Sequence, residues 1–204
     1  CGMPTALHGV ERGGVRLGDT VLVLGSGPVG LSAVALARMS GALRVLCIGA
    51  PANRLEAART MGADATLSIE EADEAERLDW VRDETGGRGA EVTIEAAGAP
   101  DAAVQALRFT RDAGRVVVLG QYTDHGEVPF NPHLDLNRKH LDVRGTWGFD
   151  FSHIYRGVQI LSDPDRAAPW RALRLSRYGL ARADEAMADV EAGRVIKALI
   201  DPAA

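Results

Sequence analysis

The sequence has few cysteines, no long apolar run and no excess of positive charge. Cys1 and Cys47 are its two cysteines, and two thiols in 204 residues do not form a disulfide framework, so a reducing, cytoplasmic location is expected. No apolar run approaches the ~20 residues of a membrane span. No basic segment followed by an apolar one opens the chain, so neither a membrane span nor an export signal is predicted. The net charge of −5 provides no electrostatic attraction to nucleic acid or to an anionic membrane, and neither is expected as a partner.

The remaining composition is that of an ordinary globular protein. Hydrophobic residues make up 46% of the chain and charged residues 25%, which is enough for one full core and part of a second. The acidic cluster EEADEAER at 70–77 is interpreted as a solvated helix face rather than an acidic tail. Cys47 lies within an apolar run and is therefore expected in the core.

Short apolar runs alternate with stretches of helical period along the first three quarters of the chain. The expected strands are 20–25, 43–49, 65–69, 90–98, 115–120 and 141–145. The expected helices between them, each ending on glycine, are 28–41, 52–62, 73–87 and 99–114. Three of the runs are apolar without alternation, as in strands buried on both faces. This order predicts an α/β fold with a doubly wound, six-stranded parallel sheet of the Rossmann type.

The two ends of the chain do not fit into that sheet. Helices are expected at 152–162 and 182–193 and a strand at 194–200, but the sheet is complete by about residue 145. An open apolar strand invites aggregation, so the last strand requires a partner. We therefore expect an N-terminal limb (1–18), a dinucleotide-binding Rossmann domain (19–145) and a C-terminal limb (146–204) of a second domain whose bulk is absent. Alternatively, residues 146–204 cap the sheet or pair within an oligomer.

The segment GSGPVG at 25–30 has the glycine spacing of a phosphate-binding loop. Gly25 allows the tight turn out of the strand, Gly27 lets the backbone approach a pyrophosphate, and Gly30 lets the helix pack close to the strand. With Pro28 and Val29 the segment opens a helix, whose N-terminus favours negative charge. Because it follows a strand and leads to a second strand at the expected distance, it predicts binding of NAD or NADP. A tight turn without ligand, or the similar loop of a methyltransferase, is the alternative.

The end of the second strand bears on the choice of cofactor. Gly49 stands where an acidic residue would bind the ribose 2′-hydroxyl of NAD. Without that carboxylate, and with Arg54 close by, a 2′-phosphate can be accommodated, which indicates a slight preference for NADP over NAD. The alternative for Arg54 is a solvated residue in the first helical turn.

The segment CGMPTALHGVERGGVRLGDTVLVLGSGPVGLSAVALARMSGALRV at 1–45 resembles the zinc-containing medium-chain alcohol and polyol dehydrogenases. The resemblance continues through NRLEAARTMGAD, TGGRGAEVTIEAAG, GRVVVLG and ADVEAGRVIKALI, and so covers nearly the whole chain. It implies hydride transfer between nicotinamide and an alcohol, a polyol or its carbonyl product, and a homo-oligomer. It also implies a second, barrel-like catalytic domain, built from an N-terminal part and the final segment of the chain.

The resemblance also implies roles for individual residues. Cys1 matches the third protein ligand of the catalytic zinc, and Thr5 matches a residue that contacts nicotinamide. Lys197 matches a basic residue on the pyrophosphate. Positions lining the nicotinamide pocket match Ala96, Leu119, Thr146 and Gly148. The alternatives are a terminal thiol without metal for Cys1, a helix cap for Thr5, a solvated lysine for Lys197 and strand-end packing for the rest.

Catalysis is not expected from this chain alone. The first two zinc ligands, the proton relay and the structural zinc lobe of the family would all lie upstream of Cys1. Zinc is therefore expected only in the complete enzyme, and the isolated chain is expected to be inactive. A zinc-free reductase of the same superfamily, or a non-catalytic nucleotide-binding sensor or partner module, remains the alternative.

Several other polar residues receive a structural interpretation. His125, His133, His140 and His153 do not show the close spacing of metal ligands, and those in the polar loop 121–140 are expected to face solvent. Trp147 either borders the substrate space or packs. No partner for Asp19 or Asp150 is evident from the sequence.

Overall fold

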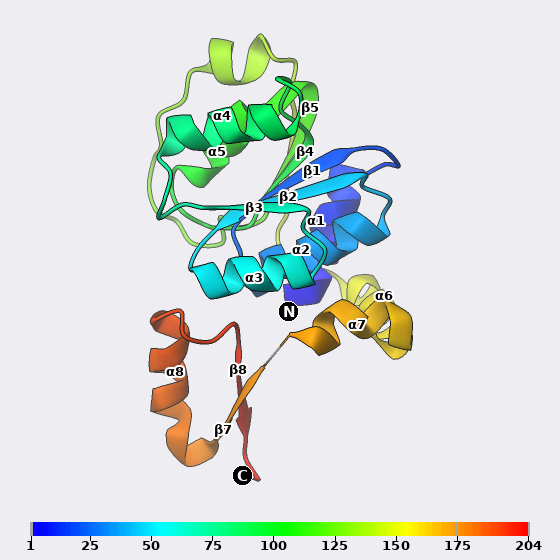
Figure 1. Cartoon of the computed structure of the whole chain (residues 1–204), viewed down its shortest axis with the longest axis vertical. Helices are drawn as coiled ribbons and strands as arrows, with labels where there is room; N and C mark the ends of the chain where they lie inside the picture. Colours follow the sequence, from blue (N-terminus) through cyan, green and yellow to red (C-terminus); the bar gives the residue numbers. More distant parts are fainter. Residues whose placement is uncertain (1, 174, 204) are drawn as a thin grey trace.

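The main body of the molecule is a parallel sheet with helices on both faces (Figure 1). The structure is a computed structural model that describes residues 2–173 and 175–203. Its strands are β1 (Thr20–Leu24), β2 (Arg44–Gly49), β3 (Ala65–Ser68), β4 (Ala90–Glu95), β5 (Thr110–Val118) and β6 (Asp142–Gly145). They pair in the order β3-β2-β1-β4-β5-β6, all parallel, which confirms the predicted Rossmann-type sheet.

Side chains alternate between two apolar cores, one on each face of the sheet. On β1, Val21 and Val23 belong to one core, whereas Leu22 and Leu24 belong to the other. On β2, Cys47 belongs to the first core and is fully buried, as predicted. Because both faces are covered, these strands are apolar throughout, which is the pattern that the sequence shows.

Three helices cover one face of the sheet and two cover the other (Figure 1). The first face carries α1 (Gly2–Gly13), α2 (Pro28–Met39) and α3 (Ala52–Thr60). The second face carries α4 (Glu74–Glu84) and α5 (Ala102–Phe109). Each of the four helices expected after β1 is present.

The predicted boundary between the last of these helices and the strand after it is wrong, because the helix expected at 99–114 ends at Phe109. Thr110 is extended and already pairs with β4, and Ala113 has a φ of 55°, which a right-handed helix does not allow. The register between β4 and β5 shifts here, so that Ala90 faces Thr110 but Val92 faces Arg115. The residues between Thr110 and Arg115 therefore form a bulge in β5.

The N-terminal helix, which lies within the expected limb 1–18, packs on the main body. Met3, Ala6, Leu7 and Val10 are buried in the same core as β1 and α2. Gly9 permits this approach, because a Cβ at this position would overlap the Leu119 side chain. The sequence pattern could not reveal this packing because the surface that anchors α1 is formed by later parts of the chain.

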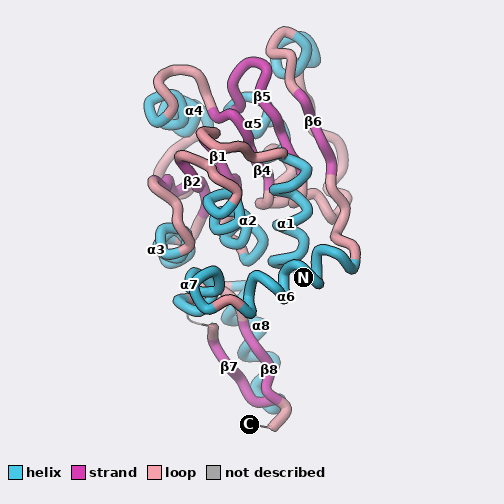
Figure 2. Tube along the Cα trace, turned by 90° about the vertical axis from the view of Figure 1, so that its right-hand side faces the viewer, coloured by secondary structure: helices cyan, strands magenta, loops and turns pink. Residues whose placement is uncertain are grey.

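The chain after β6 continues through helices and a small second sheet. These elements are α6 (Phe151–Ser162), α7 (Pro164–Ala172), β7 (Ser176–Gly179), a 3₁₀ turn (Leu180–Arg182), α8 (Ala183–Glu191) and β8 (Ala198–Asp201). A π-helical turn, η1 (Pro132–Asn137), precedes β6. β7 and β8 pair in parallel and, with α8, extend away from the six-stranded sheet (Figure 2). We call β7, α8 and β8 the C-terminal unit.

The strand expected at 194–200 is only partly present. β8 begins at Ala198 because the preceding residues turn back onto α8, where the Arg194 amide donates to the Asp189 carbonyl at 2.9 Å. The partner of β8 is the short segment SRYG, which carries no apolar alternation and was not predicted as a strand. Within residues 2–173 and 175–203, no helix combines the length and apolarity needed to cross a bilayer.

Candidate functional site

A cavity of about 440 Å³ lies at the carboxyl ends of β1, β2 and β4. β1 lies between β2 and β4, so chain connections leave it in opposite directions at this point, where open parallel sheets bind their ligands. The cavity brings together five residues singled out from the sequence. These are Gly25, Gly27, Gly49, Arg54 and Ala96.

The three glycines of the loop meet different surroundings. Gly25 has a φ of 105°, and a Cβ there would lie 2.7 Å from the Ala96 carbonyl carbon. A Cβ on Gly30 would overlap the Gly25 carbonyl oxygen. A Cβ on Gly27, in contrast, would meet no atom of the described residues within 4 Å. Gly25 and Gly30 are therefore required by the packing of the protein itself, whereas Gly27 borders open space in the cavity.

The N-terminus of α2 supplies backbone donors beside this space. Gly27 is the N-cap and offers no side-chain cap, and Pro28 occupies the first turn. The first amides of a helix have no acceptor within the helix, and its dipole is positive at this end. With Pro28, Val29 and Gly30 in this turn, the loop forms an anion-binding geometry that needs no charged side chain.

Gly49 has a steric role that the sequence did not reveal. A Cβ at this position would lie 2.7 Å from the Ser26 Cβ and 2.9 Å from the Ser26 amide nitrogen. The Ser26 hydroxyl in turn donates to the Ala50 carbonyl at 3.0 Å. An aspartate at position 49 would therefore require the glycine loop to move. The close approach of Ser26 is thus a second reason for glycine here, besides the absence of a carboxylate that would repel a 2′-phosphate.

Two half-buried arginines line the same cavity, Arg54 from α3 and Arg77 from α4. The Nε atom of each is buried and has no hydrogen-bond partner in the part of the chain that the structure describes. Within the described residues, neither guanidinium lies within 4.0 Å of a carboxylate. Sequence reasoning missed Arg77 and its neighbours Asp101 and Gln105, since nothing in a polar helix face indicates which side chain turns inward.

Glu95, the last residue of β4, organises the loops next to the cavity. It is fully buried, and its carboxylate accepts from the amides of Ala97 and Gly98 at 2.8 and 2.7 Å and of Gly120 at 3.0 Å. Burial raises the pKa of Glu95, and the three amides oppose that shift. The bonds tie the loop after β4 to the loop after β5 and so fix Ala96 and Leu119 relative to each other. The signal in the sequence that could have identified this role is a glutamate at the end of an otherwise largely apolar strand.

The residues expected around nicotinamide lie at the ends of β5 and β6 and on α1. Leu119 is buried, and Thr146 donates from its amide and its hydroxyl to the Val118 carbonyl at 3.0 and 3.1 Å. The Gly148 carbonyl lies 2.9 Å from Nδ1 of His8, on the same helix as the half-buried Thr5. Lys197 is exposed immediately before β8 and does not line the cavity.

The remaining polar residues have structural explanations. His125, His133 and His140 are exposed, as expected. Asp19 pairs with Arg115 at 2.6 Å. Asp150 caps α6 through bonds to Ser152 and His153, and the Ser152 bond in particular lowers its pKa to about 2.

His153 departs from the other histidines because it is buried between α1 and α6. Its Nδ1 lies 2.9 Å from the Asp150 carboxylate, and its Nε2 lies 3.5 Å from Glu11. Across the described part of the chain, no three His, Cys, Asp or Glu side chains gather in a way that could hold a metal ion. Cys1 lies outside the described residues.

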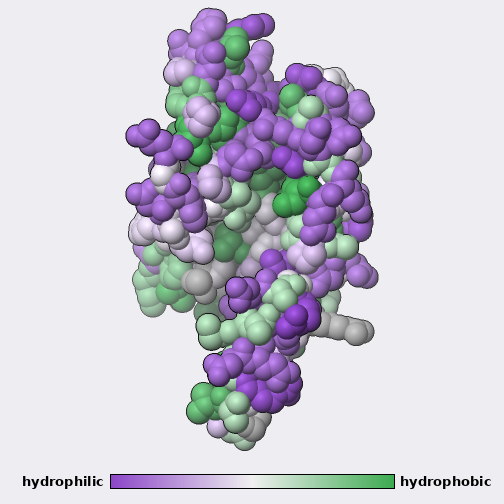
Figure 3. Space-filling model, turned by 90° about the vertical axis from the view of Figure 1, so that its left-hand side faces the viewer, coloured by the Kyte–Doolittle hydropathy of each residue, from purple (hydrophilic) through white to green (hydrophobic). Residues whose placement is uncertain are grey.

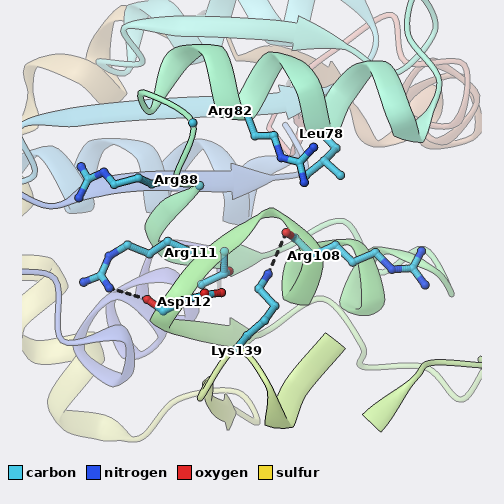
Figure 4. A pocket seen from close by; sticks show the side chains of 10 residues that line it. Leu78, Arg82, Arg88, Arg108, Arg111, Asp112 and Lys139 are labelled. Carbon is cyan, nitrogen blue, oxygen red and sulfur yellow. Dashed lines mark hydrogen bonds between the residues drawn. The ribbon is translucent and has the colours of Figure 1, made fainter. Parts of the chain in front are cut away.

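A second cavity, of about 430 Å³, lies at the opposite, amino ends of β4 and β5 (Figure 4). Its cationic side chains are Arg82, Arg88, Arg108, Arg111 and Lys139. Each arginine pairs with a carboxylate, and Figure 4 shows that they point in different directions. Lys139 donates to the carbonyls of Leu107 and Arg108 at 2.6 and 2.9 Å, so it stabilises the C-terminus of α5.

Comparison with known proteins identifies the family. The family described as zinc-binding dehydrogenase matches residues 28–163. The chain is 37% identical over 202 residues to 5-exo-hydroxycamphor dehydrogenase of Pseudomonas putida, covering 98% of this chain and 56% of that protein.

Solved structures agree with this match. An alcohol dehydrogenase of Thermotoga maritima superposes with a TM-score of 0.88 at 32% identity, over 98% of this chain and 55% of that one. A zinc-binding dehydrogenase of Sinorhizobium meliloti, solved with bound NADP, gives a TM-score of 0.84 at 28% identity, over 98% and 57%. The chain therefore spans about half the length of these relatives. On the matched sequence, the sheet order and the superposed structures, it belongs to the zinc-containing medium-chain dehydrogenase family.

Proposed function

We propose that this chain is the cofactor-binding part of a zinc-dependent dehydrogenase that oxidises an alcohol or polyol, or reduces its carbonyl product. The observation that carries the proposal is the open space beside Gly27 at the N-terminus of α2, within the cavity at the carboxyl ends of β1, β2 and β4. The NADP carried by the Sinorhizobium meliloti relative supports it.

The chain contributes binding and orientation. The glycine loop and the first turn of α2 hold the pyrophosphate, and the adenosine half extends past Gly49 towards Arg54. The nicotinamide half lies towards Leu119, Thr146 and Gly148, with Thr5 facing it from α1. When bound, the nicotinamide supplies the hydride chemistry, and the protein sets the distance and angle at which the ring meets its substrate.

Substrate activation by zinc requires ligands beyond the described residues, which contain no three-ligand group. Cys1 is assigned as one ligand of a site completed elsewhere in the full enzyme. The chain alone accordingly turns over no alcohol, and Lys197 reaches the pyrophosphate only in the complete assembly. We also assign a cytoplasmic location and a homo-oligomeric state.

We further propose a modest preference for NADP over NAD that depends on Arg54. Position 49 carries no carboxylate that could repel a 2′-phosphate, and Arg54 lines the cavity with no carboxylate partner among the described residues. A charge-assisted hydrogen bond contributes about 1.5–3 kcal/mol. Arg54→Ala should therefore weaken NADP by about tenfold or more while changing NAD less. Arg59, exposed on the same helix, provides the matched control.

Isothermal titration calorimetry with NADP, NADPH, NAD and NADH tests the proposed function. We expect the folded chain to bind at least one pair, and Gly27→Val to abolish binding because its side chain fills the open space. The control is Gly145→Val, outside the cavity, where an added Cβ likewise meets no described atom within 4 Å. Absence of binding in a folded wild-type sample, or undiminished binding by Gly27→Val, would refute the assignment.

A further inference from the structure

One end of the cavity is not explained by the glycine loop or by Arg54. It is formed by Ile69 after β3, Arg77 on α4, and Asp101 and Gln105 at the start of α5. This inference rests on the proposed function, in which the pyrophosphate binds the glycine loop and the nicotinamide lies near Leu119 and Thr146. The remaining group that needs a binding surface is the adenine ring.

Arg77 is held in a fixed plane. Its Nη1 donates to the Ala72 carbonyl at 2.9 Å and its Nη2 donates to the Gln105 side-chain oxygen at 3.3 Å. Gln105 is itself held, because its amide donates to the Asp101 carboxylate. The guanidinium is therefore fixed from two directions, by the loop before α4 and by α5.

Arg54 and Arg77 differ in what they can still bind. Within the described residues, no hydrogen bond engages the Arg54 side chain, so its two terminal nitrogens remain available for the planar, bidentate recognition of a phosphate. Both terminal nitrogens of Arg77 are already engaged by the protein, and its Nε is enclosed. Fewer donors therefore remain on the edge of Arg77 than on that of Arg54, and the bonds hold the Arg77 plane so that a flat ring can stack on its face.

We propose that Arg77 is a stacking platform for the adenine ring of the cofactor and determines how the site discriminates between bases. A guanidinium plane stacks on aromatic rings and attracts their electron-rich faces. Ile69, Ala97 and Ala102 add an apolar surface to the same cavity, which suits a flat heterocycle. Arg54 recognises the 2′-phosphate, and Arg77 recognises the base.

The test measures the binding of three dinucleotides to the same chain by calorimetry: NAD, NADP and nicotinamide cytosine dinucleotide, whose smaller base offers less stacking area. Arg77→Met should weaken NAD and NADP by the same factor, about 3- to 30-fold, the range of cation–π contributions. It should weaken the cytosine dinucleotide less, so that wild-type discrimination between adenine and cytosine shrinks. Arg82→Met, on the exposed surface of the same helix, is the matched control and should leave all three unchanged.

Two further variants distinguish a loss of stacking from a loss of folding. Arg77→Lys keeps the positive charge but lacks the planar guanidinium, so its affinity for NAD should lie between those of the wild type and Arg77→Met. Gln105→Leu removes the bond that orients Arg77, and should reduce base discrimination without altering the NADP-to-NAD ratio. Circular dichroism and thermal unfolding establish that each variant is folded.

Three results would overturn the inference. A larger loss of NADP than of NAD in Arg77→Met would make Arg77 a phosphate ligand. An equal loss of the adenine and cytosine dinucleotides would show a structural role, and no loss would show no role. Failure of the proposed function is distinct from all three, because the wild-type chain would then bind none of the dinucleotides.

Discussion

The six-stranded sheet and the C-terminal unit are both parallel sheets, but they differ in what covers them. The strands of the large sheet have helices on both faces, and Ile48 on β2 is 2% exposed. The two strands of the C-terminal unit contact α8 and the 3₁₀ turn Leu180–Arg182, and Ile200 on β8 is 41% exposed. Figure 3 shows hydrophobic residues on the surface at the end of the molecule that this unit forms.

This difference indicates where the stability of the chain resides. A two-stranded sheet is marginally stable in water, whereas a sheet of six strands with two covered faces supports a domain. On α8, Met187 is 71% exposed, and few side chains of the unit are buried. We interpret the C-terminal unit as a segment whose apolar surface is completed by other parts of the full enzyme, in line with its match to relatives about twice as long.

Truncating an isoleucine to alanine in each sheet should give the largest difference between the two regions. Ile48→Ala should lower the free energy of unfolding by about 2–5 kcal/mol, because it leaves a cavity in a closed core. Ile200→Ala should cost less than about 1 kcal/mol, because water already reaches the side chain. Urea unfolding followed by circular dichroism measures both. Equal losses would show that the C-terminal unit is as well packed as the body.

The contrast also explains how much of the fold the sequence could predict. Strands buried on both faces, such as β1 and β2, are apolar without interruption and were recognised within a residue or two. β7 was missed because SRYG carries no such pattern, and β8 was predicted too long because RVIK is apolar enough to resemble a strand. The docking of α1 was missed for another reason, since it depends on Leu119 and on strands far along the chain.

Prediction of the candidate site was limited in a similar way. The glycine loop was found because turn geometry and helix-end electrostatics require glycine at particular positions. Gly49 and Arg54 were found because the end of β2 has a known distance from that loop. Glu95 and Arg77 were missed because their roles depend on backbone amides and side chains that meet only in three dimensions.

Glu95, buried in the large sheet, should produce a smaller effect, which is a dependence of stability on pH. Because burial raises its pKa above the ordinary value of 4.5, folding favours the protonated carboxyl. Its contribution to stability is therefore complete below about pH 4.5 and decreases as pH rises through the raised pKa. Glu95→Gln should flatten this pH dependence. It should also cost about 1–3 kcal/mol, since an amide group cannot accept from all three backbone donors.

Urea unfolding of the Glu95→Gln variant between pH 4.5 and 8 provides the measurement. Glu191→Gln, on the exposed end of α8, is the matched control and should stay within about 0.5 kcal/mol of wild type. If Glu95→Gln keeps the wild-type pH dependence, the titrating group lies elsewhere in the molecule.

The smallest expected effect leaves stability unchanged and concerns local opening. Burial raises the pKa of Cys47 to about 12, so in the folded body its thiol should react with an aromatic disulfide only when β2 opens. A Cys1→Ser background leaves Cys47 as the sole thiol, and adding Ala198→Cys places a second reporter on the half-exposed β8. The thiol at position 198 should react at least about tenfold faster, because a two-stranded sheet opens at little cost. Equal rates for the two thiols would mean that the C-terminal unit opens only together with the six-stranded sheet, and the two regions would then form one cooperative unit.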